Sequence, residues 1–345
     1  MINYPRVSII MPNYNGLSYI GKRDITNVLL SFLSTNYPDF ELIFVDNNSN
    51  DGTINFISKT FKIFLMSEKL KIIETGMMGY TSGCNQAFDM ASGKYIVIVN
   101  NDDKPCDRVW LKKLILECEK NDKYVCFGKK VKWDSPKLID SLGLSINKAG
   151  LVKQENICEL SNKFKEKKEF FAYQTPVAIR KDIIHKMGGY LFDEDYVVLN
   201  TDIDLSWRLR LFGYHIINIP EVIVFHKRSA TMKQLPIKYV AFQGRKNMLQ
   251  TLLKNYELKN LIKWLPISLG LYFMSIFYYL TKRRIDQVEA TIHAIFWNLI
   301  NLKKIMRKRK YIQMCVRKTS DESILRLMRP FRFSEIIRSR KPWPK

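Results

Sequence analysis

Short apolar runs alternate with helix-period segments through the first hundred residues. Four runs predict buried strands, at residues 7–11, 42–45, 71–74 and 95–99. Between them, apolar residues recur at helical spacing, which predicts helices over 24–36, from Asp51 or Thr53 onward, and up to Ala91. Strands that alternate with helices in this way indicate βαβ units, and therefore an α/β fold with a mostly parallel sheet.

The pattern changes after residue 134. Residues 134–170 lose the regular period and become rich in Lys, Glu and Ser, so we expect an insertion or a mobile loop region there. Regular elements return at 170–179, with helices expected near 181–187 and over 202–212. Gly213 is placed to end the second of these helices. Two further strands are predicted, at 216–219 and 222–225.

Polar and acidic residues follow three of the early strands. They are Pro12-Asn13-Tyr14-Asn15, the run from Asp46 to Gly52, and Asn100-Asn101-Asp102-Asp103. The carboxyl ends of parallel strands meet at one edge of the sheet, and that edge is where open α/β sheets bind ligands. The three segments therefore predict a single binding site. The sequence has no GxxxxGK[ST] and no GxGxxG motif, which disfavours a P-loop or dinucleotide-binding protein.

Three residues offer chemistry at this predicted site. Asp102, with Asp103 beside it, follows a strand, where carboxylates can bind a hard divalent cation. The alternative is a solvated turn in which Asp102 caps a helix that begins near Pro105. Asp202 lies at the start of a predicted helix, whose free N–H groups and dipole keep a carboxylate ionised, as a general base requires. His226 follows a strand and is a second candidate metal ligand.

The region around Asp202 has a structural interpretation as well. Asp202 can serve as the N-cap of its helix, and Asp204 can pair with Arg208 one turn further on. Trp207 lies on the same amphipathic helix. We therefore treat Asp103, Asp204, Trp207 and Arg208 as possible support for the site.

The ordered set of motifs resembles the family 2 glycosyltransferases. Its members are Val7-Ser-Ile-Ile-Met-Pro-Asn-Tyr-Asn-Gly16, Phe44-Val-Asp-Asn-Asn-Ser-Asn-Asp-Gly-Thr53, Gly79-Tyr-Thr-Ser-Gly-Cys-Asn85, Ile98-Val-Asn-Asn-Asp102, Phe192-Asp-Glu194, Thr201-Asp-Ile-Asp-Leu-Ser-Trp-Arg-Leu-Arg210, Gly213-Tyr214 and Val224-Phe-His226. The resemblance covers about residues 5–230 and is greatest to the rhamnosyltransferase-like branch that builds cell-surface glycans. It implies a GT-A fold, a nucleotide-diphosphate-sugar donor, a divalent metal (Mn²⁺ or Mg²⁺) and inversion at the anomeric carbon.

The resemblance also implies residue roles. Asp202 matches the catalytic base, Asp102 the metal ligand, and His226 a residue that helps to hold the metal or the diphosphate. The residues implied to bind the nucleotide-sugar are Pro12, Asn13, Tyr14, Asp46, Gly79, Asn85, Asn100 and Asn101. Two positions depart from the family pattern: Thr201 replaces a Glu, and Asn100 replaces the first Asp of the metal motif. No Gln-x-x-Arg-Trp motif is present, so we expect a non-processive enzyme.

The charge of the chain is concentrated at its C-terminal end. The 345 residues carry a net +23, of which residues 231–345 hold +19. This basic segment includes an uncharged apolar run over 264–281, flanked by Lys and Arg, and an amphipathic pattern over 285–302. We expect 231–345 to be a helical extension that lies on an anionic membrane surface through 259–310, at the cytoplasmic face of the cell membrane. A helical subdomain packed on the catalytic core and a single membrane span are the alternatives.

The expected organisation is therefore a GT-A catalytic domain over 1–230 and the C-terminal extension. Residues 1–103 form the nucleotide-sugar-binding half, and 104–230 the acceptor-binding half with its variable insertion at 134–170. The basic extension favours a glycan or lipid-linked acceptor. A nucleic-acid partner is not expected, because the basic residues adjoin an apolar helix rather than a sheet face with interleaved aromatics. A nucleotidyltransferase and a catalytically weakened family member that only binds nucleotide-sugar, membrane or nucleic acid remain as rival interpretations.

Overall fold

The computed structural model describes residues 4–76, 79–227 and 234–332. Its main sheet has ten strands, and eight of them follow the order β10-β12-β6-β11-β4-β1-β2-β3, while β5 pairs with β12 and β7 with β6. These strands are β1 (Val7–Asn13), β2 (Phe40–Asn47), β3 (Leu70–Thr75), β4 (Tyr95–Ile98), β5 (Asp103–Pro105), β6 (Tyr124–Lys132), β7 (Ser135–Ser141), β10 (Lys168–Glu169), β11 (Val177–Arg180) and β12 (His215–His226). The predicted boundary at 230/231 lies outside the described residues.

The N-terminal half is the parallel sheet that the hydrophobic pattern predicts. β1 pairs in parallel with β2 and β4, and β2 with β3. The helices of this half are α1 (Gly16–Tyr19), α2 (Lys22–Leu33), α3 (Thr53–Thr60), α4 (Lys62–Met66), α5 (Gly79–Met90) and α6 (Trp110–Lys120). β1 and β2 are buried along almost their whole length, which explains their continuous apolar runs. The α/β prediction is confirmed. The helix considered near Pro105 is wrong, because Pro105 ends β5 and α6 begins at Trp110.

The second half adds antiparallel neighbours to this sheet. β11 runs antiparallel to both β4 and β6, whereas β12 is parallel to β6. The two strands predicted at 216–219 and 222–225 are one strand, β12, with a register irregularity between Ile219 and Ile223. Pro220 lies inside that irregularity. Since proline has no N–H to donate, it interrupts the ladder without ending the strand.

Residues 134–170 are more regular than the sequence indicates. They contain β7 and β10, a separate hairpin of β8 (Leu144–Ile146) with β9 (Val152–Gln154), and a short 3₁₀ turn, Ser161–Lys163. The expectation of a mobile loop region is therefore wrong. These strands are only two to seven residues long, which is too short for a clear period in the sequence.

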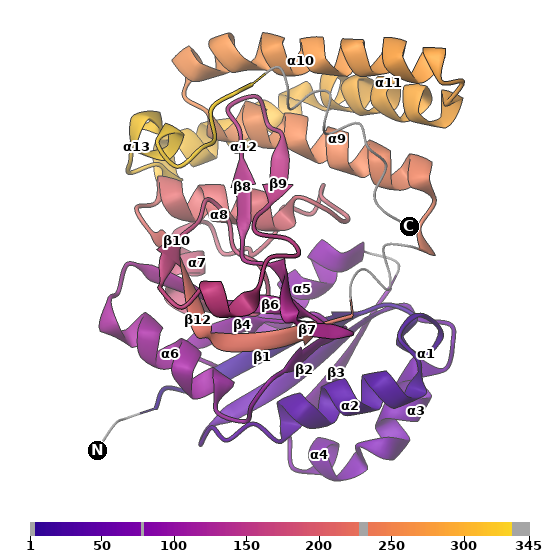
Figure 1. Cartoon of the computed structure of the whole chain (residues 1–345), viewed down its shortest axis with the longest axis vertical. Helices are drawn as coiled ribbons and strands as arrows, with labels where there is room; N and C mark the ends of the chain where they lie inside the picture. Colours follow the sequence, from indigo (N-terminus) through magenta and orange to yellow (C-terminus); the bar gives the residue numbers. More distant parts are fainter. Residues whose placement is uncertain (1–3, 77–78, 228–233, 333–345) are drawn as a thin grey trace.

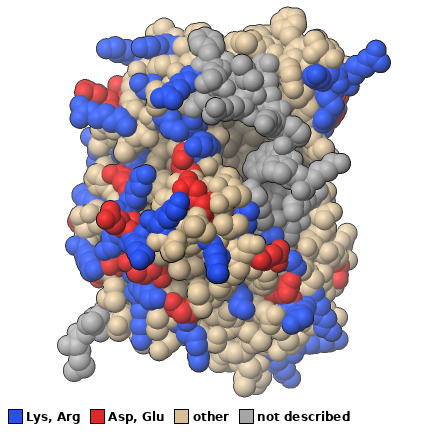
Figure 2. All heavy atoms as spheres, in the orientation of Figure 1, with Lys and Arg blue, Asp and Glu red and all other residues tan. Residues whose placement is uncertain are grey.

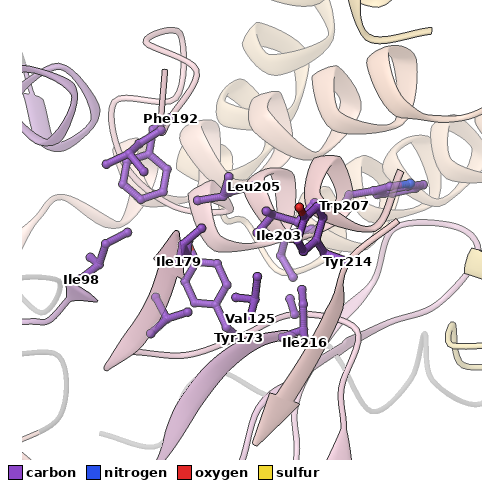
Figure 3. Packing of buried hydrophobic residues seen from close by; sticks show 14 of the residues in the cluster. Ile98, Val125, Tyr173, Ile179, Phe192, Ile203, Leu205, Trp207, Tyr214 and Ile216 are labelled. Carbon is purple, nitrogen blue, oxygen red and sulfur yellow. The ribbon is translucent and has the colours of Figure 1, made fainter. Parts of the chain in front are cut away.

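Two apolar clusters, one of them centred between the sheet and α8 (Thr201–Leu211), form the core. Figure 3 shows side chains of the sheet, such as Val125 and Ile216, pointing toward Ile203 and Leu205 of α8. Trp207 is buried and packs edge-on against Phe171. Nine of the eleven residues of α8 are buried. The helix is therefore enclosed on nearly every side and has no exposed polar face.

The C-terminal helices stack above the sheet, with α10 furthest from it (Figure 1). They are α9 (Ile237–Asn255), α10 (Leu258–Thr281), α11 (Ile285–Ile300), α12 (Leu302–Tyr311) and α13 (Asp321–Leu325), with one π-helical segment at Ile312–Val316. Leu252 of α9, Ile305 of α12 and Ile324 of α13 belong to the same apolar cluster as residues of the sheet and α8. This part of the extension is packed on the sheet domain and shares its core.

Buried charges join α9 and α12 to the segment before α8. Lys254 is fully buried and pairs with Asp193 at 2.5 Å and with Asp204 at 3.1 Å. Lys308 of α12 also pairs with Asp193. Burial alone would raise the pKa of Asp193, but the ammonium groups of Lys254 and Lys308 hold that pKa well below its usual range. Asp193 is therefore ionised, and its charge is satisfied by residues more than sixty positions away.

By contrast, α10 presents much of its apolar surface to solvent. Among the described residues, one helix, Leu258–Thr281, is long and apolar enough to cross a membrane by length and composition, with a mean hydropathy of 1.4 over its best window. Only 11% of that window is buried. In Figure 2, Lys and Arg lie near both ends of the uppermost layer, and uncharged atoms lie along its upper edge.

We predict that Lys254→Met destabilises the folded protein by about 3 kcal/mol, because it leaves Asp193 and Asp204 buried with less compensating charge. Urea unfolding followed by circular dichroism measures this change. Lys186→Ala is the matched control: it removes a lysine from an exposed pair with Asp182, and we expect almost no change. Equal stability of K254M and wild type would contradict the structural role of the buried pair.

Candidate active site

The ends of β4 and β12 bring together two carboxylates and an imidazole. Ligand atoms of Asp102, Asp103 and His226 all lie within 4.8 Å of one another. The His226 Nε2 atom is 3.5 Å from Asp102 Oδ2, and its Nδ1 atom is 2.7 Å from Asp140 Oδ2. Asp140, on β7, thus orients the ring so that Nε2 faces Asp102. A carboxylate behind a histidine is a common arrangement at metal sites, because it fixes the ring and raises the basicity of the other nitrogen.

Asp103 is engaged by its own neighbours rather than free to bind a ligand. It is fully buried, and its Oδ1 atom pairs with Lys130 Nζ at 2.8 Å. Its Oδ2 atom accepts hydrogen bonds from the Thr175 hydroxyl at 2.7 Å and from the Asn100 N–H at 3.2 Å. Asp103 therefore holds the turn that carries Asp102, and Asp102 and His226 are left as the pair that faces the site.

The charge state of His226 follows from these contacts. Burial and Lys130 each lower its pKa, yet the carboxylates of Asp102 and Asp140 outweigh them and raise the pKa to about 9. In the protonated ring, each nitrogen carries a proton that faces one of the two carboxylates. A divalent cation would take the place of the proton between Nε2 and Asp102 Oδ2, so the donor set fits such an ion.

Asp202 lies in the first turn of α8, within electrostatic reach of the same lysine. Burial is the main cause of the raised pKa of Asp202, Tyr80 and Tyr173; Lys130 offsets part of the rise at Asp202, and the charge of Asp202 adds to the rise at both tyrosines. Lys130 also lowers the pKa of His226, so Asp202 and His226 both lie within electrostatic range of one buried ammonium group. The predicted convergence of these distant residues is thus compatible with the fold.

Burial raises the pKa of Asp202 to about 6, and the Ile203 N–H and Lys130 offset only part of that rise. The expectation that the helix N-terminus determines its acidity therefore needs correction, because desolvation outweighs the dipole here. At neutral pH the carboxylate is still ionised. A carboxylate with a pKa near 6 is a stronger base than an ordinary aspartate, which suits proton abstraction.

The supporting residues of α8 face away from this site. Asp204 pairs with Arg208 at 3.0 Å, as the structural interpretation of the sequence predicts, and also with Lys254 of α9. Arg208 and Trp207 are fully buried. Asp204 and Trp207 connect α8 to Lys254 and Tyr256 of the C-terminal extension, whereas Arg208 donates to the Leu191 carbonyl. Any effect of these residues on the site therefore acts through the position of the helix.

The residues implied to hold the nucleotide lie along the ends of β1 and β2. Asn13 donates to Asp46 at 2.8 Å, and Asn101 donates to Asn13 at 2.7 Å. Asp46 also accepts from the Ser49 hydroxyl. These side chains are buried and hydrogen-bonded to one another, which fixes the relative positions of three strand ends. Pro12 is buried within β1, whereas Tyr14 is partly exposed and contacts Tyr19 edge-on.

Gly79 and Asn85 belong to α5 and contact the segment before α8. Gly79 has φ +82°, and a Cβ there would lie 2.6 Å from a methyl group of Val197. Both the left-handed backbone and the close approach require glycine. Asn85 exchanges two hydrogen bonds with the backbone of Phe192, at 2.9 and 3.0 Å. Asn85 therefore tethers α5 to the segment before α8.

Three residues of the site were missed by the sequence analysis. Lys130 and Asp140 lie on strands β6 and β7, and Thr175 lies just before β11. Lys130 stands in the second half of an otherwise buried strand, and a charged residue in such a place is a usable signal. Asp140 falls in the segment taken for a loop, and nothing in the sequence pairs it with His226.

Comparison with known proteins identifies the family and the fold type of this chain. The pattern that defines "Glycosyl transferase family 2" matches residues 8–188, which is more than half of the chain. The fold is of the GT-A type, as solved structures of that type align with it. The chain therefore belongs to glycosyl transferase family 2. Asp202 and His226 lie beyond the matched range, so their roles rest on the geometry described above.

Individual relatives are distant. The putative teichuronic acid biosynthesis glycosyltransferase TuaG of Bacillus subtilis is 32% identical over 101 residues, 29% of this chain and 37% of TuaG. The S. aureus TarS fragment 1–349 solved with UDP-GlcNAc aligns with a TM-score of 0.56 at 15% identity, over 89% of this chain and 90% of that one. A mannosyltransferase from Pyrobaculum calidifontis, solved with GDP-Man and Mn²⁺, has a TM-score of 0.52 at 15% identity, over 90% and 86%. The chain spans 16% to 53% of the lengths of the curated relatives it matches.

We predict that Mn²⁺ raises the melting temperature of the wild-type protein and that Asp102→Asn removes this rise, because the variant loses a carboxylate ligand. Differential scanning fluorimetry over a Mn²⁺ titration measures it. Asp107→Asn is the control, since Asp107 lies in the same region of sequence but pairs with Lys113 at the surface. A Mn²⁺-induced rise of equal size in D102N and D107N would exclude Asp102 as a ligand.

Proposed function

We propose that this protein is an inverting, metal-dependent and non-processive glycosyltransferase that moves a sugar from a nucleotide-diphosphate-sugar to an acceptor hydroxyl. The observation that supports this most directly is the cluster of Asp102, Asp103 and His226, whose ligand atoms lie within 4.8 Å of one another, together with the raised pKa of Asp202 in the first turn of α8. The cluster offers cation ligands for a diphosphate, and Asp202 offers a base. Among the relatives with printed functions, TuaG is named a putative teichuronic acid biosynthesis glycosyltransferase and TarS a poly(ribitol-phosphate) beta-N-acetylglucosaminyltransferase.

The chain's own residues perform three tasks in this mechanism. Lys130 and Thr175 fix Asp103, and Asp103 fixes the turn that presents Asp102. Asp140 orients the His226 ring. A divalent cation bound by Asp102 and His226 would supply positive charge against the departing diphosphate.

Asp202 then accepts the proton of the acceptor hydroxyl as that oxygen attacks the anomeric carbon. The bond from this carbon to the diphosphate oxygen breaks on the opposite side, and the configuration inverts in one step. Thr201 and Asn100 leave fewer carboxylates in the site than the family pattern has. Asp202 therefore has no carboxylate directly before it in the sequence, and its raised pKa derives mainly from burial.

We also propose that the acceptor is a lipid-linked or cell-surface glycan intermediate, and that the donor sugar is a hexose or deoxyhexose. The rhamnosyltransferase-like branch remains our prediction for the subgroup. RfbC of Myxococcus xanthus, an O-antigen biosynthesis protein, and TuaG act in surface-glycan synthesis by their names, which supports this class of acceptor. Lipid-linked intermediates lie at membranes, so the exposed apolar helices of the extension fit the same proposal.

For membrane contact, we propose that α10 and α11 lie on the cytoplasmic face of the cell membrane. The side chains of Phe277 and Phe296 are 68% and 59% exposed, and the two helices are neighbours joined by a three-residue basic turn. The following helix, α12, contains six Lys and Arg residues, of which Lys304 and Lys308 pair with Asp195 and Asp193 and the other four make no ion pair among the described residues. Exposed aromatic residues beside basic residues match an anionic lipid surface, because the rings enter the acyl boundary while the cations meet the headgroups.

We predict that Asp202→Asn lowers turnover by at least about a hundredfold while donor affinity is unchanged, because only the base is removed. Wild-type turnover is expected to rise with pH through about 6, since Asp202 accepts a proton only when ionised. Initial rates at saturating donor, measured from pH 5 to 8, test both statements. The acidic limb should be absent in the residual activity of D202N.

Asp182→Asn serves as the control, because Asp182 is exposed in α7 (Lys181–Lys186) and pairs only at the surface. We expect D182N to have wild-type rates and the wild-type pH profile. An unchanged turnover number in D202N would overturn the assignment of the base.

We predict that the double variant Phe277→Asp/Phe296→Asp binds phosphatidylglycerol-containing vesicles at least about tenfold more weakly than the wild type. The reason is that the variant loses two rings that would enter the lipid on binding. Vesicle co-sedimentation measures the affinity. Met66→Asp is the control, since Met66 is an exposed apolar residue of α4, which is distant in the sequence from α10 and α11. Equal binding of all three proteins would exclude this surface as the membrane contact.

A further inference from the structure

The segment before the catalytic helix has an unusual backbone. Residues 193–200, here named the pre-base loop, connect Phe192 to α8 and end two residues before Asp202. Leu199 and Asn200 both have left-handed conformations, with φ of +68° and +57°. Two consecutive non-glycine residues rarely adopt this conformation, and a bulky leucine least of all. Such a conformation persists only when its surroundings hold it in place.

Helix α9 holds this part of the loop directly. The Asn247 side chain, which is fully buried, donates from Nδ2 to the carbonyls of Val198 at 2.7 Å and Leu199 at 2.8 Å. In return, Asn200 donates from Nδ2 to the carbonyl of Gly244 at 2.8 Å. Three hydrogen bonds therefore connect one turn of α9 to three successive loop residues, including both left-handed ones.

The rest of the pre-base loop is attached to the same helix. Lys246 donates to the Asp195 carbonyl at 2.5 Å, and Gln250 donates to the Asp195 carboxylate at 3.2 Å. The hydroxyls of Tyr196 and Thr251 lie 2.7 Å apart. Contacts with the loop recur along α9 from Gly244 to Lys254, so the helix holds the loop along its length.

We propose that Asn247 is a positioning residue: by fixing the left-handed turn at Leu199–Asn200, it sets the direction in which α8 begins and so the place of Asp202. This inference rests on the proposed function, because it takes Asp202 as the base. Asn247 has no direct role in the chemistry. Its side-chain hydrogen bonds go to backbone carbonyls only, so its amide N–H groups hold the part of the loop at Val198 and Leu199.

The test is Asn247→Leu, which keeps the side-chain volume close to that of asparagine and removes both donors. We expect kcat to fall at least about tenfold with the donor KM within about twofold, because misplacement of a base lowers turnover without altering donor contacts. Asn298→Leu is the matched control. Asn298 is another buried asparagine, which donates to carbonyls of Lys246 and Ala294 and does not touch the loop. We expect N298L to keep wild-type kcat.

A double-mutant cycle with Asp202→Asn separates positioning from general damage. If Asn247 acts through Asp202, D202N/N247L is no slower than D202N, because the base is already absent. Additive losses would overturn the proposal, and so would a fall in N298L as large as that in N247L. A strong loss in D202N with no loss in N247L would overturn the positioning role and leave the proposed function standing. An unchanged D202N would overturn both.

Should N247L not fold, Asn200→Gly tests the same contact from the loop side. Glycine accepts the left-handed backbone, so N200G removes only the hydrogen bond to the Gly244 carbonyl. We expect a smaller fall in kcat, again with unchanged donor KM and no additivity with D202N. Wild-type kcat in N200G would then overturn the proposal.

Discussion

The buried ion pair between Lys130 and Asp103 is the interaction on which the site depends. Both side chains are almost fully enclosed, at 4% and 0% exposure, so neither charge is tolerable without the other. The pair joins β6 to the turn after β4 and thereby connects the two halves of the catalytic domain. Its energetic contribution is modest in principle, since desolvation opposes the attraction. Its main consequence is geometric: the pair holds the turn that carries Asp102. Lys130 also lowers the pKa values of His226 and Asp202.

A second group of buried charges attaches the C-terminal helices to the sheet domain. Asp193 and Asp204 lie in the catalytic half, and Lys254 lies in α9, with none of the three exposed by more than a few per cent. A catalytic half without α9 would keep two buried carboxylates but lose their ammonium partner. The apolar core also continues from Trp207 into Tyr256. For these reasons we propose that the catalytic domain and the extension, although distinct in charge and composition, fold together.

The parallel half of the fold was predictable from the sequence because its strands are long, buried and separated by helices with a clear period. β1, β2 and β4 lie where the apolar runs predict them, and the polar segments after them do meet at one edge, as the Asn101–Asn13–Asp46 chain of hydrogen bonds shows. β8 and β9 were not predictable, since each has three residues. The boundaries of β12 were missed because Pro220 usually ends a strand, whereas here it lies within a bulge.

The candidate site was predictable only in part, and the reason is physical. Asp102, Asp202 and His226 were found because each stands at the end of a strand or the start of a helix, where position alone indicates chemistry. Lys130, Asp140 and Thr175 act through partners that are close only in the folded chain. The acidity of Asp202 had the same limit: the sequence shows the helix terminus, whereas the burial that raises the pKa of Asp202 arises only in the folded chain.

Helix α9 links the two ends of the molecule that the proposed function needs. It packs against α11 and also holds the pre-base loop through Lys246 and Asn247. In the proposed membrane-bound arrangement, α9 thus connects the lipid-contacting helices to the proposed base by hydrogen bonds and buried ion pairs rather than by a flexible linker. We propose that α9 thereby sets the distance from the lipid surface to Asp202, so that a lipid-anchored acceptor would be selected by the length of the glycan between the lipid and the reactive sugar.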